Sequence, residues 1–325
     1  MKFSLAPVQS KNRFDKLKHQ AILAEQFGYE ALWAHEHHSE GMMYPSPLMV
    51  LSILASKTKT IKLGTNMLLL SLHHPVRVAE EGAMVDNLSN GRLRLGVSAG
   101  YSEIDLKAFN VDPKNRGHKM EEGLSIIRKL WSGGRVDIDD EFTHLHDFSV
   151  FPPIVQQPRP PIYVGATVNK AIQRAARLGD EFLISATQRK SDIPRILDVY
   201  KAELQSLGDN FDNKTTTINR LVHVVENNEQ KKWAREFFGN ALLRLYDSWG
   251  HSNITELDDR ERVLDEVCDQ NFIIGEPSEC IERINEYKDL GIGEIACLMN
   301  FGGPDLDKVE SSMKLMSEKV MPEFL

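Results

Sequence analysis

The sequence has little cysteine, no long apolar run and no excess of positive charge. Its three cysteines, Cys268, Cys280 and Cys297, are spread over 325 residues, so they form neither a disulfide framework nor a CxxC zinc motif. No apolar run approaches the roughly 20 residues that span a bilayer. The opening segment Met1–Pro7 lacks the features of a signal peptide. These absences favour a cytoplasmic protein with no membrane attachment.

Acidic side chains outnumber basic ones. Lysine and arginine total 39, aspartate and glutamate total 47, and the formal net charge is −8. Nucleic acids and anionic membranes are bound through a positive field, so the charge argues against both as partners. Hydrophobic residues make up 41% of the chain and charged residues 26%, a balance typical of globular proteins.

Short apolar runs alternate with stretches of helical periodicity along the whole chain. The runs that predict strands are residues 2–5, 31–34, 61–70, 92–98, 162–164, 182–185, 216–226 and 294–298. The stretches that predict helices are residues 12–27, 47–56, 75–88, 103–109, 116–131, 169–178, 192–207, 228–249, 278–290 and 308–321. Ser278 is the expected N-cap of the helix over residues 278–290.

This alternation predicts parallel strands joined by right-handed crossovers. About eight such units fit an α/β protein with a single (β/α)₈ TIM barrel domain over residues 1–325. The alternative is a doubly wound open sheet, but no G-x-G-x-x-G motif follows the first strand and no P-loop occurs. Residues 133–151 are expected to form a hairpin insertion, and residues 253–271 are polar and ambiguous.

Histidines follow the second predicted strand. In a barrel the chemistry gathers at the carboxyl ends of the strands, and His35-Glu36-His37-His38 lies at such an end. Imidazoles there suit acid–base work near neutral pH, with Glu36 as a hydrogen-bond partner. A metal site is an alternative, although the H-E-x-x-H spacing is absent. Surface histidines without a catalytic role explain the residue types equally well.

The segment Gly96–Gly100 follows the fourth predicted strand and matches the G-x-S-x-G nucleophile elbow. A hydrolase with Ser98 as nucleophile is therefore a rival hypothesis, with His223 or His251 as scattered triad partners. Small residues at a strand end also let a flat ligand approach the backbone. After the fifth strand, Gly165–Thr167 leads into a helix whose N-terminus could bind an anion together with Arg116.

Several longer motifs resemble the bacterial luciferase-like family of flavin-dependent monooxygenases. They include Glu36-His37-His38, the segment from Leu63 to Met67, the segment from His74 to Gly96, and carboxyl-terminal motifs around Gly275–Cys280 and Ser312–Pro322. The similarity runs nearly end to end in one collinear order. It implies a (β/α)₈ barrel that binds FMN at the carboxyl ends of its strands.

The resemblance also implies an activity. Reduced FMN from a separate flavin reductase would react with O₂ to a flavin C4a-hydroperoxide, which oxidises a small organic substrate such as an aldehyde. His37 matches the catalytic histidine of the family, and Asn66-Met67 matches a non-prolyl cis peptide that lies against the flavin. The positions matched to cofactor binding are Glu36, His38, Asn66, Met67, Ser98, Arg116, Gly165, Thr167, Val168, Asn169, Ser185 and Ala186. No metal ligand is implied.

The sequence departs from the light-emitting subunit at several of these positions. Ser98 replaces a reactive cysteine, Ala99 a phosphate-binding arginine, Val168 a serine and Ala186 a tryptophan. A non-luminescent member of the family is therefore expected. Two alternatives on the same barrel are a deazaflavin-dependent hydride-transfer enzyme and a non-catalytic flavin-binding accessory subunit. The resemblance further implies a homodimer, with the predicted helices over residues 12–27, 47–56 and 75–88 as candidate contacts.

Overall fold

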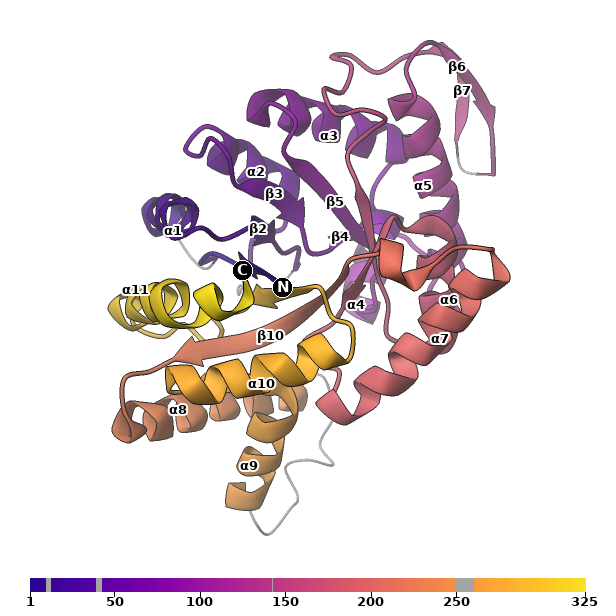
Figure 1. The fold of residues 1–325 in the computed structure, drawn as a ribbon. Coiled ribbons are helices and arrows are strands. Elements are labelled where there is room, and N and C mark those ends of the chain that lie inside the picture. The colour runs from indigo at the N-terminus through magenta and orange to yellow at the C-terminus, as the bar shows by residue number, and fades with distance from the viewer. Residues whose placement is uncertain (10–12, 39–42, 142, 249–259) are drawn as a thin grey trace.

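The structure is a computed structural model that describes residues 1–9, 13–38, 43–141, 143–248 and 260–325. Parallel strands form a central barrel, and helices surround it (Figure 1). The barrel strands are β1 (Lys2–Leu5), β2 (Ala31–Ala34), β3 (Lys62–Thr65), β5 (Leu93–Ser98), β8 (Ile162–Gly165), β9 (Glu181–Ile184), β10 (Thr216–Val224) and β12 (Glu294–Cys297).

Pairing of neighbours closes the ring. Each of these strands pairs in parallel with the next, β9 pairs with β10, and β12 pairs with both β10 and β1. The described chain thus has the closed eight-stranded parallel barrel that the alternation predicted. Its assignment to a single domain over residues 1–325 stays a prediction.

Most of the surrounding helices agree closely with the predicted ranges. The helices are α1 (Phe14–Gln26), α2 (Pro47–Ala55), α3 (Pro75–Ser89), α4 (Glu103–Ala108), α5 (Arg116–Trp131), α6 (Asn169–Leu178), α7 (Ile193–Ser206), α8 (Asn228–Ser248), α9 (Arg260–Asn271), α10 (Pro277–Asp289) and α11 (Leu306–Leu315). Helix α9 was not predicted, and α11 ends at Leu315, before a short π-helix (Met316–Val320) and a 3₁₀ turn (Met321–Phe324). The expected hairpin is confirmed as β6 (Val136–Asp139) paired antiparallel with β7 (His144–Phe148).

Three predictions about local structure need correction. The strand expected over residues 61–70 ends at Thr65 and resumes only as β4 (Leu68–Leu69); the peptide bond between Asn66 and Met67, in the interruption, is cis. Helix α10 is capped by Glu276 rather than by Ser278, because Glu276 and Glu279 form a reciprocal capping box around Pro277.

The third correction adds β11 (Phe272–Gly275), a strand that was not among the predicted ones. It pairs with residues 221–224, the carboxyl-terminal half of β10, outside the ring. Of the polar segment left ambiguous, residues 260–271 form α9, whereas residues 253–259 lie outside the described residues. Helices α8 and α9 pack with β11 around a second, smaller core that includes Phe238, Val267 and Phe272.

Large side chains fill the barrel interior beside glycines. The ring of the fully buried Trp33 packs directly against Gly64, so that a Cβ atom added to Gly64 would lie 2.1 Å from the ring. At the amino-terminal end of the barrel, the carboxylate of Glu294 accepts hydrogen bonds from Trp33 Nε1 at 3.2 Å and Arg94 Nη1 at 3.1 Å. Arg94 also pairs with Glu30. This end of the barrel is therefore closed by packed and paired side chains.

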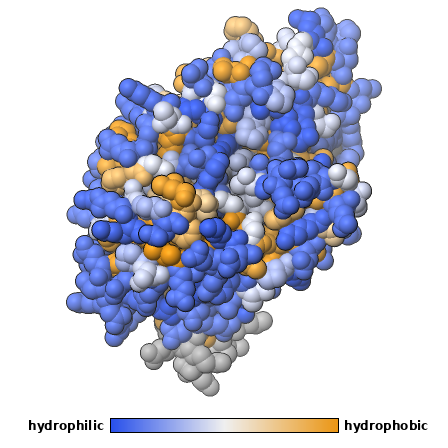
Figure 2. All heavy atoms as spheres, viewed as in Figure 1, coloured by the Kyte–Doolittle hydropathy of each residue, from blue (hydrophilic) through white to orange (hydrophobic). Residues whose placement is uncertain are grey.

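The surface carries mainly hydrophilic residues on the face seen in Figure 2, with apolar residues scattered across its middle. Within the described residues, no helix combines the length and the apolar character needed to cross a membrane.

Candidate active site

Glu36 organises the mouth of the barrel at the end of β2. The Oε1 atom of this buried carboxylate lies 2.8 Å from His38 Nε2 and 2.7 Å from His73 Nε2. Its Oε2 atom accepts a hydrogen bond from Leu69 N at 2.9 Å. Burial raises the pKa of Glu36, but the contacts with His73, Leu69 and His38 outweigh burial and lower it below its usual value. Glu36 is thus an ionised bridge between two imidazoles.

The flanking histidines differ in environment. His37 and His38 are half-buried, and the His38 ring lies 4.7 Å from the Phe109 ring at the end of α4. His35 is buried, and its pKa is lowered to about 3 by burial and by the nearby His37. His37 is therefore the partly exposed imidazole of the pair, next to a buried and neutral His35.

Two buried polar atoms near this mouth have no hydrogen-bond partner among the described residues. They are Nδ1 of His35 and Oε1 of Gln9, which follow β2 and β1 respectively. Buried polar atoms are normally paired with protein or with another molecule. Such atoms at the carboxyl ends of two adjacent strands fit a site that receives a polar ligand.

Asn66 and Met67 lie at the carboxyl end of β3, joined by the cis peptide that the resemblance implies. The buried Asn66 exchanges side-chain amide hydrogen bonds with Asn219 of β10, at 2.7 and 3.2 Å. The Met67 side chain packs against Gly165, where an added Cβ would lie 3.0 Å from Met67 Cε. Gly165 therefore accommodates Met67, and contact of either residue with a cofactor stays a prediction.

Ser98 ends β5 and is half-buried. No hydrogen bond joins it to a histidine within the described part of the chain. The proposed triad partner His223 lies in the smaller core, 5.7 Å from the Trp233 ring and 5.2 Å from the Phe238 ring. His251 falls outside the described residues. The described geometry therefore gives the hydrolase hypothesis no catalytic pair.

The glycine of the same motif has a structural role. A Cβ on Gly96 would lie 2.0 Å from the carbonyl oxygen of Thr65. Thr65 Oγ1 also donates to the Gly96 carbonyl at 2.7 Å and accepts from Gly96 N at 2.9 Å. Our alternative that these small residues admit a flat ligand is wrong at Gly96, because strand β3 already occupies that space.

The predicted phosphate turn is exposed at the start of α6. Thr167, Val168 and Asn169 face solvent, and the first helical hydrogen bond runs from Ala171 N to Val168 O at 2.8 Å. The N–H groups that precede this bond are oriented out of the helix end, which suits an anion.

Arg116 begins the neighbouring helix α5. Its Nη1 donates to the Pro113 carbonyl at 2.8 Å, which engages one of the guanidinium's five N–H donors. The next residue, Gly117, packs against Arg174 of α6, where an added Cβ would lie 2.7 Å from Nη2. The structure thus brings the start of α5 against α6.

Ser185 and Ala186 follow β9 and are half-buried. Ser185 Oγ lies 3.0 Å from Thr187 Oγ1 and accepts from Thr187 N at 3.3 Å. Asn271 at the end of α9 donates to Ala186 O at 2.9 Å. The turn is therefore held by polar contacts on both sides.

Sequence reasoning noted His73 after the third strand but did not assign it to the site, and it missed Asn219 and Asn271 altogether. His73 stands two residues from Ser71, whose hydroxyl donates to Ala99 O at 2.8 Å and ties the β3 and β5 ends together. His73, Asn219 and Asn271 reach the site from segments distant in sequence, so only the position of His73 after a strand offered a signal.

Comparison with known proteins gives the class of this site. The luciferase-like monooxygenase family matches residues 2–294, so the chain belongs to that family. A flavin-dependent trigonelline monooxygenase, oxygenase component, from Acinetobacter baylyi is 26% identical, with 97% of this chain and 91% of the relative covered. An alkanal monooxygenase alpha chain from Photorhabdus luminescens is 28% identical, with 92% and 88% covered. The chain is an enzyme of the oxidoreductase class.

Solved structures agree on the fold. The oxygenating constituent of 3,6-diketocamphane monooxygenase from Pseudomonas putida, in complex with FMN, superposes with a TM-score of 0.84 at 20% identity over 100% of this chain and 99% of the other. A coenzyme F420 dependent tetrahydromethanopterin reductase from Methanopyrus kandleri gives 0.81 at 18% identity over 100% and 99%. These likenesses confirm the barrel.

Proposed function

We propose that this protein is the oxygenase component of an FMN-dependent monooxygenase that uses O₂ to oxidise a small organic substrate, such as an aldehyde. The observation that carries the proposal is the Glu36 cluster at the barrel mouth, with His38 and His73 bound to the carboxylate and His37 half-buried beside them. It is supported by relatives named as monooxygenases, one of them flavin-dependent and described as an oxygenase component.

The residues present fit a flat cofactor that carries a phosphate. The exposed N-terminus of α6 at Thr167–Asn169 suits the phosphate, with Arg116 of the adjacent helix as a further donor. The half-buried Ser185 and Ala186 suit the polar edge of the flavin ring. The cluster of Glu36, His37 and His38 suits the opposite side of that ring. When bound, the reduced flavin supplies the electrons that activate O₂.

Within this site the chain's own residues bind, exclude water and move protons. His37 is the proposed acid–base residue, because it is partly exposed and next to the neutral His35. The buried Glu36 orients His38 and His73 and keeps a negative charge at the mouth. Met67, which packs against Gly165, adds an apolar side chain that helps to exclude water from the proposed site.

The test compares wild type with His37→Ala. The purified protein receives reduced FMN and O₂ with a panel of aldehydes and other small organic compounds, and both product and released peroxide are measured. We expect His37→Ala to bind FMN as wild type does but to lose at least about 100-fold in product formation, the lower range of general acid–base effects. A normal product yield in His37→Ala would contradict the role of His37.

A deazaflavin-dependent hydride transfer is the second candidate, favoured by the likeness of the fold to the F420-dependent reductase. It needs no O₂, so oxygen consumption separates it from the first. A non-catalytic accessory subunit is the third, and the intact cluster of Glu36, His38 and His73 argues against it.

For the oxygenase we further propose a separate reductase that delivers reduced FMN, a cytoplasmic location and a homodimer. Helices α2 and α3 expose Met49, Met84 and Leu88, with 67%, 47% and 56% of each residue accessible. Apolar residues of this size on adjacent helices suit burial against a second copy. Sedimentation of the purified protein at several concentrations measures this directly.

A further inference from the structure

The loop between β9 and α7 is held from outside the barrel by helix α9. Asn271, the last residue of α9, donates from Nδ2 to Ala186 O at 2.9 Å and to Gln188 O at 3.3 Å. One residue earlier, Gln270 Oε1 accepts a hydrogen bond from Ser191 N at 3.0 Å. The end of α9 therefore fixes three main-chain groups of this loop.

Asn271 is buried and its two acceptor residues, Ala186 and Gln188, are half-buried, which gives these contacts more weight than exposed surface pairs. Asn271 is 4% exposed. The fully buried Arg220 of β10 donates from Nη2 to the same Gln188 carbonyl at 3.0 Å, and from Nε to Tyr287 Oη at 2.7 Å. A carbonyl shielded from water loses a stabilising contact when such a donor is removed. The position of Gln188 is thus determined from two sides, by α9 and by β10.

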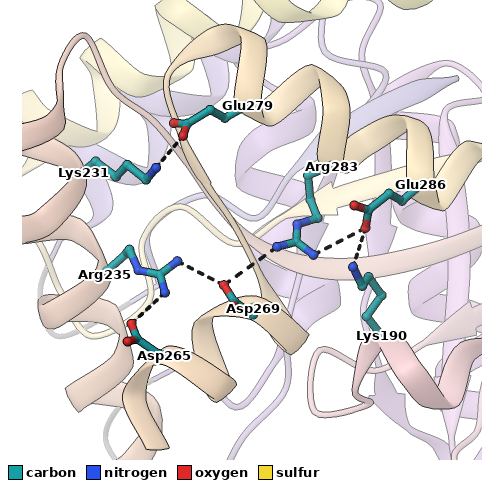
Figure 3. A network of polar contacts seen from close by, with 8 residues as sticks. All are labelled: Lys190, Lys231, Arg235, Asp265, Asp269, Glu279, Arg283 and Glu286. Atoms are coloured by element: carbon teal, nitrogen blue, oxygen red, sulfur yellow. Dashed lines mark hydrogen bonds and ion pairs between the residues drawn. The ribbon is translucent and has the colours of Figure 1, made fainter. Parts of the chain in front are cut away.

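Ion pairs continue the connection across the outer helices. Figure 3 shows Lys190 of the loop paired with Glu286 of α10, and Arg283 of α10 between Glu286 and Asp269 of α9. Asp269 pairs in turn with Arg235 of α8, at 3.3 Å. Exposed pairs contribute little singly. Together they link α8, α9 and α10 next to the contact that Asn271 makes.

The loop in question carries Ser185 and Ala186, the residues that suit the polar edge of the flavin ring. We propose that Asn271 is a positioning residue for the cofactor, which fixes the Ala186 and Gln188 carbonyls and so sets the shape of the turn. This inference rests on the proposed function. Because α9 packs in the smaller core with α8 and β11, cofactor affinity depends on a part of the chain that lies outside the barrel.

The experiment compares Asn271→Ala with a matched control. Asn87 of α3 likewise donates its side-chain amide to a distant main-chain carbonyl, Pro153 O at 2.7 Å, far from residues 185–188 in sequence and outside the site. Three readouts are measured: amide hydrogen exchange of residues 185–191 without cofactor, the dissociation constant for FMN from fluorescence quenching, and the visible circular dichroism of FMN at saturation.

We expect Asn271→Ala to exchange faster at residues 185–191, to bind FMN about tenfold more weakly, and to alter the dichroism of the bound flavin. Asn87→Ala should match wild type in all three, and Asn271→Gln, which keeps the amide, should restore part of the affinity. If Asn271→Ala is unfolded, Asn271→Ser replaces it with the same expectations.

Unchanged exchange and unchanged FMN affinity in a folded variant overturn the inference. So does faster exchange with unchanged affinity and dichroism, because the contact is then structural only. Absence of FMN binding by wild type is a different result, since it overturns the proposed function itself. If Asn87→Ala binds FMN as weakly as Asn271→Ala does, the effect is a general loss of stability, and this result also overturns the inference.

Discussion

His35 and His223 are imidazoles that the fold keeps neutral. Burial and the neighbouring His37 lower the pKa of His35 to about 3, and burial and the nearby Lys308 lower that of His223 to about 4. In the unfolded chain both groups titrate near pH 6.5. As the pH falls below 6.5 the unfolded chain therefore binds more protons, and the free energy of unfolding decreases.

Glu181 has the opposite effect on the free energy of unfolding over part of this pH range. Burial raises its pKa to about 7 from an ordinary value of 4.5. Between these values the folded chain binds the extra proton, so this group adds stability as the pH falls through 7. Of the three groups, two histidines act against one carboxyl, which leaves a net loss of stability between about pH 6.5 and 4.5.

We predict that His223→Phe reduces this pH dependence. The phenylalanine ring keeps the contacts with Trp233 and Phe238 but has no proton to bind. Chemical denaturation at pH 6 and pH 5 should show a slope smaller than that of wild type by about 1 kcal/mol per pH unit. The exposed His144→Phe is the control and should keep the wild-type slope, whereas an unchanged slope in His223→Phe would show that its pKa is not depressed.

At the scale of elements, strands β3 and β5 are held close together by a glycine. The Gly96 backbone exchanges two hydrogen bonds with Thr65 Oγ1, and no space remains for a side chain. The β3 strand ends at this contact, just before Asn66 and Met67 enter the site. The approach of these strands thus positions one side of the barrel mouth.

We predict that Gly96→Ala destabilises the protein by about 2 kcal/mol or more, because its Cβ would lie 2.0 Å from a backbone oxygen that cannot move alone. Gly293→Ala is the matched control, since its Cβ would lie 3.3 Å from the Thr215 methyl group and 3.9 Å from the nearest backbone atoms. Thermal unfolding of both variants measures the difference. Equal melting temperatures would contradict the proposed contact.

The barrel could be predicted from the sequence because each of its strands is a short apolar run between helical stretches. Strand β11 was missed although Phe272–Ile274 is also a short apolar run, because it directly follows the polar segment over residues 253–271 and pairs outside the ring, with β10. The N-cap of α10 was predicted at Ser278 because serine is a commoner capping residue than glutamate. Glu276 caps the helix instead, through its reciprocal hydrogen bonds with Glu279.

The candidate site, too, could be predicted from the sequence only in part. Glu36, His37 and His38 could be placed at the mouth because they directly follow a strand. The bond from Glu36 to His73, 37 residues away, and the bond from Asn271 to Ala186, 85 residues away, depend on tertiary packing. No local pattern in the sequence predicts such contacts, so the supporting side of the site emerged only with the structure.

At the scale of the whole molecule, a smaller core of α8, α9 and β11 adjoins the barrel along β10 and at the loop after β9. The barrel supplies the histidine cluster and the exposed end of α6, and α9 fixes the loop at Ser185–Gln188. A cofactor that spans the mouth would contact both sets of residues. Cofactor identity is therefore the point on which the functional proposal depends most.

The most direct measurement is an anaerobic titration of the purified protein with reduced FMN and, separately, with reduced deazaflavin, followed by admission of O₂. We expect saturable binding of reduced FMN, rapid oxygen consumption by that complex, and much weaker binding of the deazaflavin. Tight binding of reduced deazaflavin with no oxygen consumption would contradict the monooxygenase proposal and assign hydride transfer to this site.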